Sequence, residues 1–329
     1  MEKFSSFERV VGKISEETRE QILKSKAEQF DNQFFEELKG KEREKTLEEL
    51  EIISLANEIT NEVRKRYGLD NFNVPAKNIH VIKADKWPKE KVTTPAVYNT
   101  TYEGVVMQEH PSRIVFMNRA LHEMLHFKSY KALQITDEKN SLLVDYRVGL
   151  TINARNGKKR YFTNLNEAVT EEIARRCFSK LSDKPVLIRE IKQTKEIKEK
   201  YPDAIADSGE PLFNRDTIYA EVEGKKTWSE IVGNFFGKGE KSKRISTERY
   251  SYLKERGILN VLIDKLFEKN KEDFHNREEI FELFAKGMVS GNVLPIGRLI
   301  DTTFGKGTLR KIGELDNQID EQEKIIRSL

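Results

Sequence analysis

The residues with the clearest chemistry are two histidines and a glutamate in the segment Leu121-His-Glu-Met-Leu-His126. Positions four residues apart lie on the same face of a helix, so the imidazoles of His122 and His126 can reach one metal ion. Glu123 directly follows the first histidine, and this offset brings its carboxylate beside the open coordination position. There it can take a proton from a water molecule that the metal activates. The spacing therefore predicts a catalytic metal site with Glu123 as general base.

A catalytic metal of this kind needs a third protein ligand. A metzincin would carry glycine at position 129 and histidine at position 132, where this chain has Ser129 and Ala132. No ligand motif surrounds the remaining histidines, which are His80, His110 and His275. The third ligand is therefore expected elsewhere.

The segment Leu165-Asn-Glu-Ala-Val-Thr-Glu-Glu172 is a better candidate, because it has a helical pattern with two glutamates four residues apart. One of Glu167 and Glu171 can bind the metal. The other can accept the free ring N–H of a ligand histidine and so fix its tautomer. Apolar neighbours, among them Val169 and Ile173, indicate that these carboxylates face the interior.

His122-Glu-x-x-His126 followed by Asn166-Glu-Ala-x-Thr-Glu171 resembles the gluzincin pattern of thermolysin-like zinc peptidases. The resemblance implies zinc (Zn2+) as the cofactor, Glu167 as its third ligand and Glu171 as a support for a ligand histidine. It also implies hydrolysis of peptide bonds in a peptide or protein substrate. In that family an aspartate stands in place of Glu171, and the two motifs lie closer together in thermolysin than here. The resemblance covers residues 122–172 of 329 and identifies neither a subfamily nor a substrate.

Peptide hydrolysis also needs a donor for the negative charge that develops on the carbonyl oxygen. The resemblance implies that a tyrosine, histidine or arginine supplies it. The candidates are Tyr146, Arg147 and Tyr161 in the predicted hairpin and Tyr219 further along the chain. Of these we favour Tyr161 and Tyr219.

The elements that must position these residues follow one another as helix, small sheet, helix, hairpin and helix, which is an α+β arrangement. Periodicity and turn residues predict a helix at 49–67, a strand at 78–84, a helix at 118–130, a hairpin around Asn156-Gly157 and a helix at 164–181.

Three regions are predicted. Residues 1–48 form a helical extension, residues 49–182 a zincin-like catalytic domain, and residues 183–329 a helical C-terminal region. In zincins the edge strand of a small sheet lines the cleft, where a peptide can add by main-chain hydrogen bonds. Residues 104–108 or 113–117 are expected to form that strand.

The charges are nearly balanced, with 58 basic and 55 acidic residues and a net charge of +3, which does not point to nucleic acid as a partner. Cys177 is the single cysteine, so an internal disulfide is impossible and a reducing compartment is expected. The chain starts without a signal-peptide pattern and contains no apolar run of about 18 residues. We therefore expect a cytoplasmic protein without a membrane partner, and no oligomeric state is predicted.

Three functions remain open. The chain is an active zinc peptidase, a non-catalytic or single-partner regulatory protein that uses a zincin scaffold, or a protein whose flanking helices serve mainly to bind partners. Glu123 favours the enzyme, because structural zinc sites do not need a general base and tend to be closed and rich in cysteine. Two histidines and a carboxylate suit zinc, although iron, cobalt or manganese could occupy the same ligands. Zinc binding and cleavage by a fragment of residues 49–182 would show that the flanking regions only tune substrate choice.

Overall fold

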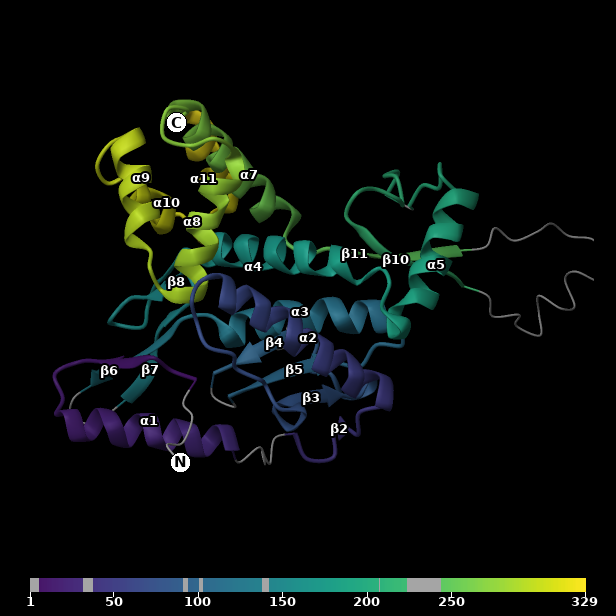
Figure 1. Cartoon of the computed structure of the whole chain (residues 1–329), viewed down its shortest axis with the longest axis horizontal. Helices are drawn as coiled ribbons and strands as arrows, with labels where there is room; N and C mark the ends of the chain where they lie inside the picture. Colours follow the sequence, from purple (N-terminus) through teal and green to yellow (C-terminus); the bar gives the residue numbers. More distant parts are fainter. Residues whose placement is uncertain are drawn as a thin grey trace, which may run out of the picture.

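The computed structural model describes residues 6–31, 38–90, 94–100, 103–137, 142–206, 208–223 and 244–329. In these ranges helices alternate with small sheets, so the predicted α+β class is confirmed (Figure 1). The helices that carry the predicted metal ligands lie in the middle of the molecule. The C-terminal helices gather at one end of this pair, and a helix with a hairpin lies at the other end.

The first sheet has the strand order β2-β3-β5-β4. β3 and β5 are parallel, whereas β4 runs antiparallel to β5 and is the last described strand on its side. Alternating and β-branched residues favour these strands, and Val81 and Val105 are fully buried. The four strands are β2 (Glu42–Arg43), β3 (Ile79–Ile82), β4 (Ala96–Asn99) and β5 (Gly104–Gln108).

The second sheet has the order β1-β6-β7-β8-β9 and begins with a strand from near the N-terminus. β1 is parallel to β6, and the other pairs are antiparallel. The Asn156-Gly157 turn joins β8 to β9, as predicted, and Gly157 has a positive φ of 68°. The strands are β1 (Arg9–Val11), β6 (Lys131–Asp137), β7 (Leu142–Val148), β8 (Thr151–Asn153) and β9 (Arg160–Tyr161), and α1 (Glu16–Asp31) contacts β1.

Three helices form the central layer: α2 (Leu47–Arg66), α3 (Arg113–Lys128) and α4 (Thr163–Phe178). α3 packs between α2 and α4 and against β4 and β5. A capping box starts α2, because Thr46 accepts the backbone N–H of Glu49 and Glu49 accepts that of Thr46. The main hydrophobic core is shared by these helices, the first sheet and the C-terminal helices.

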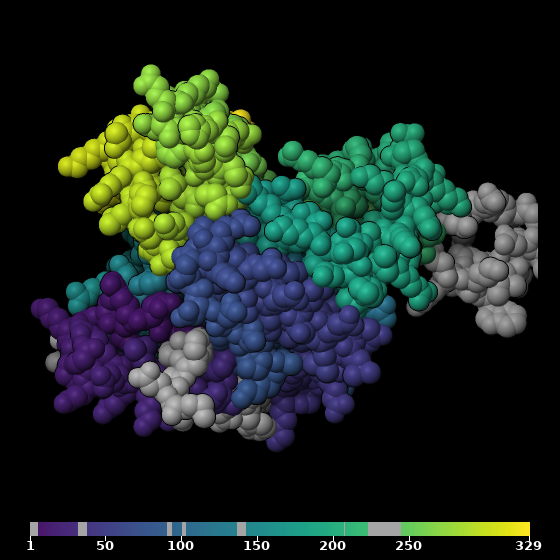
Figure 2. Space-filling view, in the orientation of Figure 1, coloured from purple at the N-terminus to yellow at the C-terminus, as the bar shows by residue number. Residues whose placement is uncertain are grey.

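The C-terminal region combines a hairpin with helices. α5 (Pro185–Lys200) packs on the hairpin of β10 (Thr217–Glu223) and β11 (Arg244–Arg249). Figure 2 shows this group and the later helices as two lobes with a hollow between them. The later helices are α7 (Leu253–Lys269), α8 (Arg277–Ser290), α9 (Leu294–Phe304), α10 (Thr308–Glu314) and α11 (Ile319–Ser328), and 3-10 turns occur at Ala76–Asn78, Ala84–Lys86 and Ser179–Leu181.

Both flanking regions were predicted to be helical, and each also contributes strands. Residues 1–48 supply β1 and β2, and residues 183–329 supply the hairpin of β10 and β11. Val10 and Val11 fit a helical spacing, but their branched side chains also suit a strand. Pairing with β6, far away in the sequence, decides the outcome.

No described helix is both long enough and apolar enough to cross a membrane.

Candidate metal centre

Helix α3 carries both predicted histidine ligands, and its N-terminus is well capped. The Ser112 hydroxyl accepts the N–H of Val115 at 3.2 Å. The carboxylate of Glu190, on α5, accepts the N–H groups of Arg113 at 3.0 Å and Ile114 at 3.1 Å. These bonds satisfy donors that every helix N-terminus leaves free, and so they fix where α3 begins.

The start of α3 corrects the prediction of a strand at 113–117. This stretch is the first part of the helix, and its residues from Ile114 to Met117 are all buried. A short apolar run of this kind shows no helical period, because it has no exposed face, and it cannot be distinguished from a buried strand by pattern alone.

Helix α4 begins without a cap from a side chain of its own. Phe162 precedes it in the left-handed conformation, with a φ of 65°. The cap comes from Asp316 near the C-terminus, whose carboxylate accepts the N–H groups of Thr163 at 2.6 Å and Asn164 at 2.9 Å. A negative charge at this end also favours the helix dipole. The helix that carries Glu167 is therefore anchored by a distant part of the chain.

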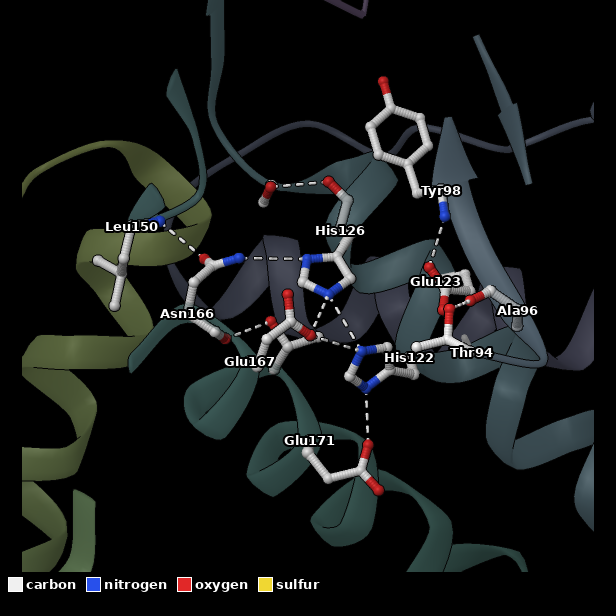
Figure 3. Close-up of polar contacts among 12 residues, drawn as sticks. Thr94, Ala96, Tyr98, His122, Glu123, His126, Leu150, Asn166, Glu167 and Glu171 are labelled. Carbon is white, nitrogen blue, oxygen red and sulfur yellow. Dashed lines mark hydrogen bonds and ion pairs between the residues drawn. The ribbon is translucent and has the colours of Figure 1, made fainter. Parts of the chain in front are cut away.

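The side chains of His122, His126 and Glu167 converge between α3 and α4 (Figure 3). His122 Nε2 and His126 Nε2 are 3.0 Å apart, and Glu167 Oε2 lies 3.2 Å and 3.1 Å from them. Ligand atoms about 2.0–2.1 Å from one tetrahedral ion would be separated by about 3.3 Å. The donor atoms and their spacing therefore fit a metal ion held by three protein ligands, as the sequence predicted.

Further contacts orient the ligands. His122 Nδ1 donates to Glu171 Oε2 at 2.6 Å, which leaves Nε2 free to face the cluster. The other oxygen of Glu171 accepts the backbone N–H of Ser251 at 2.8 Å. The Asn166 side chain lies against His126, with 3.4 Å between Nδ2 and Nδ1. The predicted position of Glu171, in support of a ligand histidine, is thus the one observed.

Glu123 lies beside the cluster, on the side of β4. Its Oε2 accepts the backbone N–H of Tyr98 at 2.6 Å. Burial raises the pKa of the Glu123 carboxyl above its usual range, against the lowering effect of the His122 and His126 imidazoles. A raised pKa suits a group that must take up a proton and then release it.

The strand beside the site is β4, so both predicted edge strands are wrong. Residues 104–108 form β5, which lies inside the sheet between β3 and β4, and residues 113–117 belong to α3. Pro95 C=O accepts the N–H of Gln108, which shows that the backbone groups at Pro95 face β5. By alternation those of Ala96 and Tyr98 face the open edge and the site.

Tyr252 is a site residue that sequence reasoning missed. Its ring stacks on that of His122, with centroids 5.4 Å apart and planes at 13°. Its side chain lies close enough to the Glu167 carboxylate to be affected by that charge. Burial raises the pKa of Tyr252 far above its usual range, and the carboxylates of Glu167 and Glu123 add to this effect, so the hydroxyl remains a donor.

Tyr252 reaches the site from the junction between β11 and α7, where it has a left-handed φ of 56°. Such a conformation is unfavourable for a residue with a large side chain and is found where surrounding contacts demand it. The alternating residues at 244–249 predict a strand that ends shortly before Tyr252. They do not predict which part of the molecule Tyr252 contacts.

The two predicted tyrosines lie elsewhere. Tyr219 donates to Glu221 on its own strand at 2.9 Å, and Tyr161 pairs with Ile152 between β9 and β8. Among the contacts of the described residues, neither tyrosine meets a metal ligand or Glu123. Arg147, a further candidate, donates to the carbonyl oxygens of Gly149, Gly287 and Gly291, so its guanidinium fastens the end of β7 to α8.

Comparison with known proteins found no protein-family model that matches the chain, and no similar curated protein or solved structure. The functional assignment therefore depends on the geometry of the residues in the site.

Proposed function

We propose that this chain is a zinc-dependent peptidase with a zincin-like core, which hydrolyses peptide bonds in peptide or protein substrates. The observation that carries the proposal is the meeting of three ligand atoms, from His122, His126 and Glu167, beside the buried carboxylate of Glu123. Metal sites that serve only structure are usually closed by a fourth protein ligand and have no use for such a carboxylate.

Two imidazoles and one carboxylate are a ligand set that zinc accepts in catalytic sites. When bound, zinc would lower the pKa of a water molecule and polarise the carbonyl group of the substrate. Glu171 keeps the proton of His122 on Nδ1, and so leaves the lone pair of Nε2 available to a metal ion.

Glu123 is the general base in this proposal. It would remove a proton from the attacking water while the oxygen forms a bond to the peptide carbonyl carbon. It would then pass that proton to the amine nitrogen as the carbon–nitrogen bond breaks. One water is consumed, and the products are one carboxylate and one protonated amine. The hydrogen bond from Tyr98 N–H fixes the orientation of the Glu123 carboxylate for both transfers.

Tyr252 is placed to stabilise the developing negative charge. Its hydroxyl is protonated, its ring stacks on that of His122, and it is close enough to Glu167 and Glu123 for their charges to raise its pKa. A hydroxyl donor fixed in a buried site stabilises an oxyanion more strongly than water does. This role replaces the predicted one for Tyr161 and Tyr219.

The open edge of β4 supplies a place for the substrate main chain. The backbone groups of Ala96 and Tyr98 face outward, next to Glu123. An extended peptide could pair with this edge and bring one of its carbonyl groups over the metal site. Thr94 already donates its hydroxyl to Ala96 C=O at 2.9 Å, so a substrate N–H would compete with or share that acceptor.

The test is hydrolysis of a mixed pool of unstructured peptides by the zinc-loaded full chain, followed by mass spectrometry. Glu123→Gln should keep one zinc per chain and lower turnover by roughly 10³-fold or more, because proton transfer by a positioned base contributes about 10²–10⁴. Glu58→Gln is the matched control, since Glu58 is exposed on α2. Equal turnover by Glu123→Gln and the wild type would contradict the proposal. Zinc binding without any cleavage by the wild type would favour the regulatory alternative.

A further inference from the structure

A fully buried lysine lies behind the edge strand. Lys131, the first residue of β6, has an exposed fraction of 0%. Its Nζ is 4.3 Å from the ring centre of Phe127, 4.6 Å from that of Tyr98 and 5.2 Å from that of Phe7. It donates a hydrogen bond to the Tyr98 hydroxyl, and no carboxylate in the part of the chain that the structure describes forms an ion pair with it.

A lysine in this place is costly for folding. Burial lowers the pKa of Lys131 to about 8, against the opposing effect of the Glu103 and Asp145 carboxylates. A methionine has a similar length and could pack among the same rings without removing an ammonium group from water. What lysine supplies here and methionine would not is the hydrogen bond that its ammonium group donates.

That group holds Tyr98. Lys131 Nζ donates to Tyr98 Oη at 2.8 Å, and the Tyr98 ring packs on Phe127 with centroids 4.7 Å apart. At its other end Tyr98 donates its backbone N–H to Glu123 Oε2 at 2.6 Å. Figure 3 shows this division, with the nitrogen toward Glu123 and the ring directed away from the histidines. One residue thus connects the buried ammonium group with the carboxylate of the site.

The turn that follows β4 is held from the same side. Thr100 donates its hydroxyl to Asp145 of β7 at 2.7 Å. Glu103, which is buried with a left-handed φ of 49°, accepts the hydroxyl of Ser6. The second sheet and the segment before β1 therefore fix one end of the β4–β5 hairpin. Of these contacts, the one made by Lys131 is to Tyr98, the residue that is hydrogen-bonded to Glu123.

We infer that Lys131 is a positioning residue for Glu123, acting through Tyr98. By holding the tyrosine hydroxyl it fixes β4 at the position where the Tyr98 N–H orients the Glu123 carboxylate. A displacement of about 1 Å in a catalytic group can lower a rate roughly 10²-fold, so a contact outside the site can govern turnover. The inference rests on the proposed function only for the task that Glu123 performs.

The test is a double-mutant cycle on the zinc-loaded full chain, with acetohydroxamate as the probe and calorimetry as the measurement. A hydroxamate binds the zinc and hydrogen-bonds with a neighbouring carboxylate, so its affinity reports the position of Glu123 without any turnover. Lys131→Met should weaken binding about tenfold when Glu123 is present and less than twofold in a Glu123→Gln background, because coupled residues are not additive. Tyr98→Phe removes only the hydroxyl and should behave in the same way, so it serves if Lys131→Met does not fold.

Lys128→Met is the control. Lys128 is also buried, with an exposed fraction of 2%, but it donates to Asn57 O at 3.2 Å and Asn61 Oδ1 at 3.0 Å, away from β4. It should weaken hydroxamate binding equally in both backgrounds, or not at all. Equal losses for Lys131→Met in the two backgrounds would show a merely structural role and overturn the inference.

A second measurement needs neither zinc nor substrate. Hydrogen exchange at the Tyr98 amide, followed by mass spectrometry of the β4 peptide, should be about tenfold faster in Lys131→Met and unchanged in Lys128→Met, a difference of about 1.4 kcal/mol. Unchanged exchange in Lys131→Met would also overturn the inference. A wild type that binds no zinc would defeat the proposed function, while this exchange experiment would still decide the role of Lys131.

Discussion

The two helices that carry the candidate metal ligands differ in how they are fixed. α3 is capped by Ser112, the residue directly before it, and by Glu190 of α5, and it carries His122, Glu123 and His126 within about one turn. α4 gives one ligand, and its cap, Asp316, comes from the far end of the chain. The start of α3 therefore has a local cap beside its distant one, whereas the start of α4 depends on a cap from the C-terminal region alone.

Further contacts from the C-terminal region reach the candidate metal centre and α4. Ser251, between β11 and α7, donates its backbone N–H to Glu171, and the ring of Tyr252 stacks on that of His122. Arg256 on α7 forms an ion pair with Asp216 at 3.0 Å and lies 3.6 Å from Glu172 of α4. The C-terminal region thus contributes contacts to the candidate metal centre.

Removal of the C-terminal region should have the largest effect on the metal centre. A fragment of residues 49–182 keeps every metal ligand but loses Asp316, Ser251 and Tyr252. We expect it to lack cooperative unfolding and to bind zinc at least 10²-fold more weakly than the full chain, since supporting contacts alone typically contribute about 10–100-fold. Circular dichroism and zinc competition with a chelator measure both. A fragment that folds and binds zinc like the full chain would show that α4 does not need its distant cap.

Removal of a single hydroxyl group tests the role of Tyr252 in the same region. Tyr252→Phe keeps the ring on His122 and removes the hydroxyl, so zinc binding should be retained while turnover falls about 10²-fold, which is the usual loss for one oxyanion donor. Tyr219→Phe is the matched control and should leave turnover within about twofold, because that hydroxyl bonds to Glu221. Equal turnover in the two variants would remove Tyr252 from the mechanism.

Glu171→Ala tests the support of the first ligand. It removes the acceptor of His122 Nδ1 and the contact with Ser251, so zinc affinity should fall about 10–100-fold. The comparison variant is Glu196→Ala, on the exposed surface of α5. If both variants bind zinc like the wild type, the hydrogen bond to His122 does not matter for the metal.

The smallest effects are expected from removing the cap residues of α3 and α4 one at a time. Ser112→Ala and Asp316→Ala should each lower the free energy of unfolding by about 1–2 kcal/mol, because each removes a helix N-cap acceptor. Asp316→Ala should also weaken zinc binding several-fold, since α4 has no cap of its own, whereas Ser112→Ala should not, since Glu190 still caps α3. Urea unfolding and chelator competition separate these outcomes. Equal zinc affinities would mean that the two helices are fixed to the same degree.

The sequence predicted what depends on spacing. His122, His126, Glu167 and Glu171 lie one helical turn apart in two pairs, and the structure places all four as expected, because a helix fixes such spacing locally. Tyr252 and the edge strand β4 were not predicted. Their places follow from sheet order and from packing between distant segments, which periodicity does not encode.

The central claim is that one metal ion is bound by His122, His126 and Glu167. Elemental analysis of the purified full chain, beside His122→Ala, tests it most directly. We expect about one zinc per chain in the wild type and almost none in the variant, since two remaining ligands hold zinc poorly. The absence of metal from the wild type after zinc has been supplied, or equal metal in both proteins, would contradict the claim.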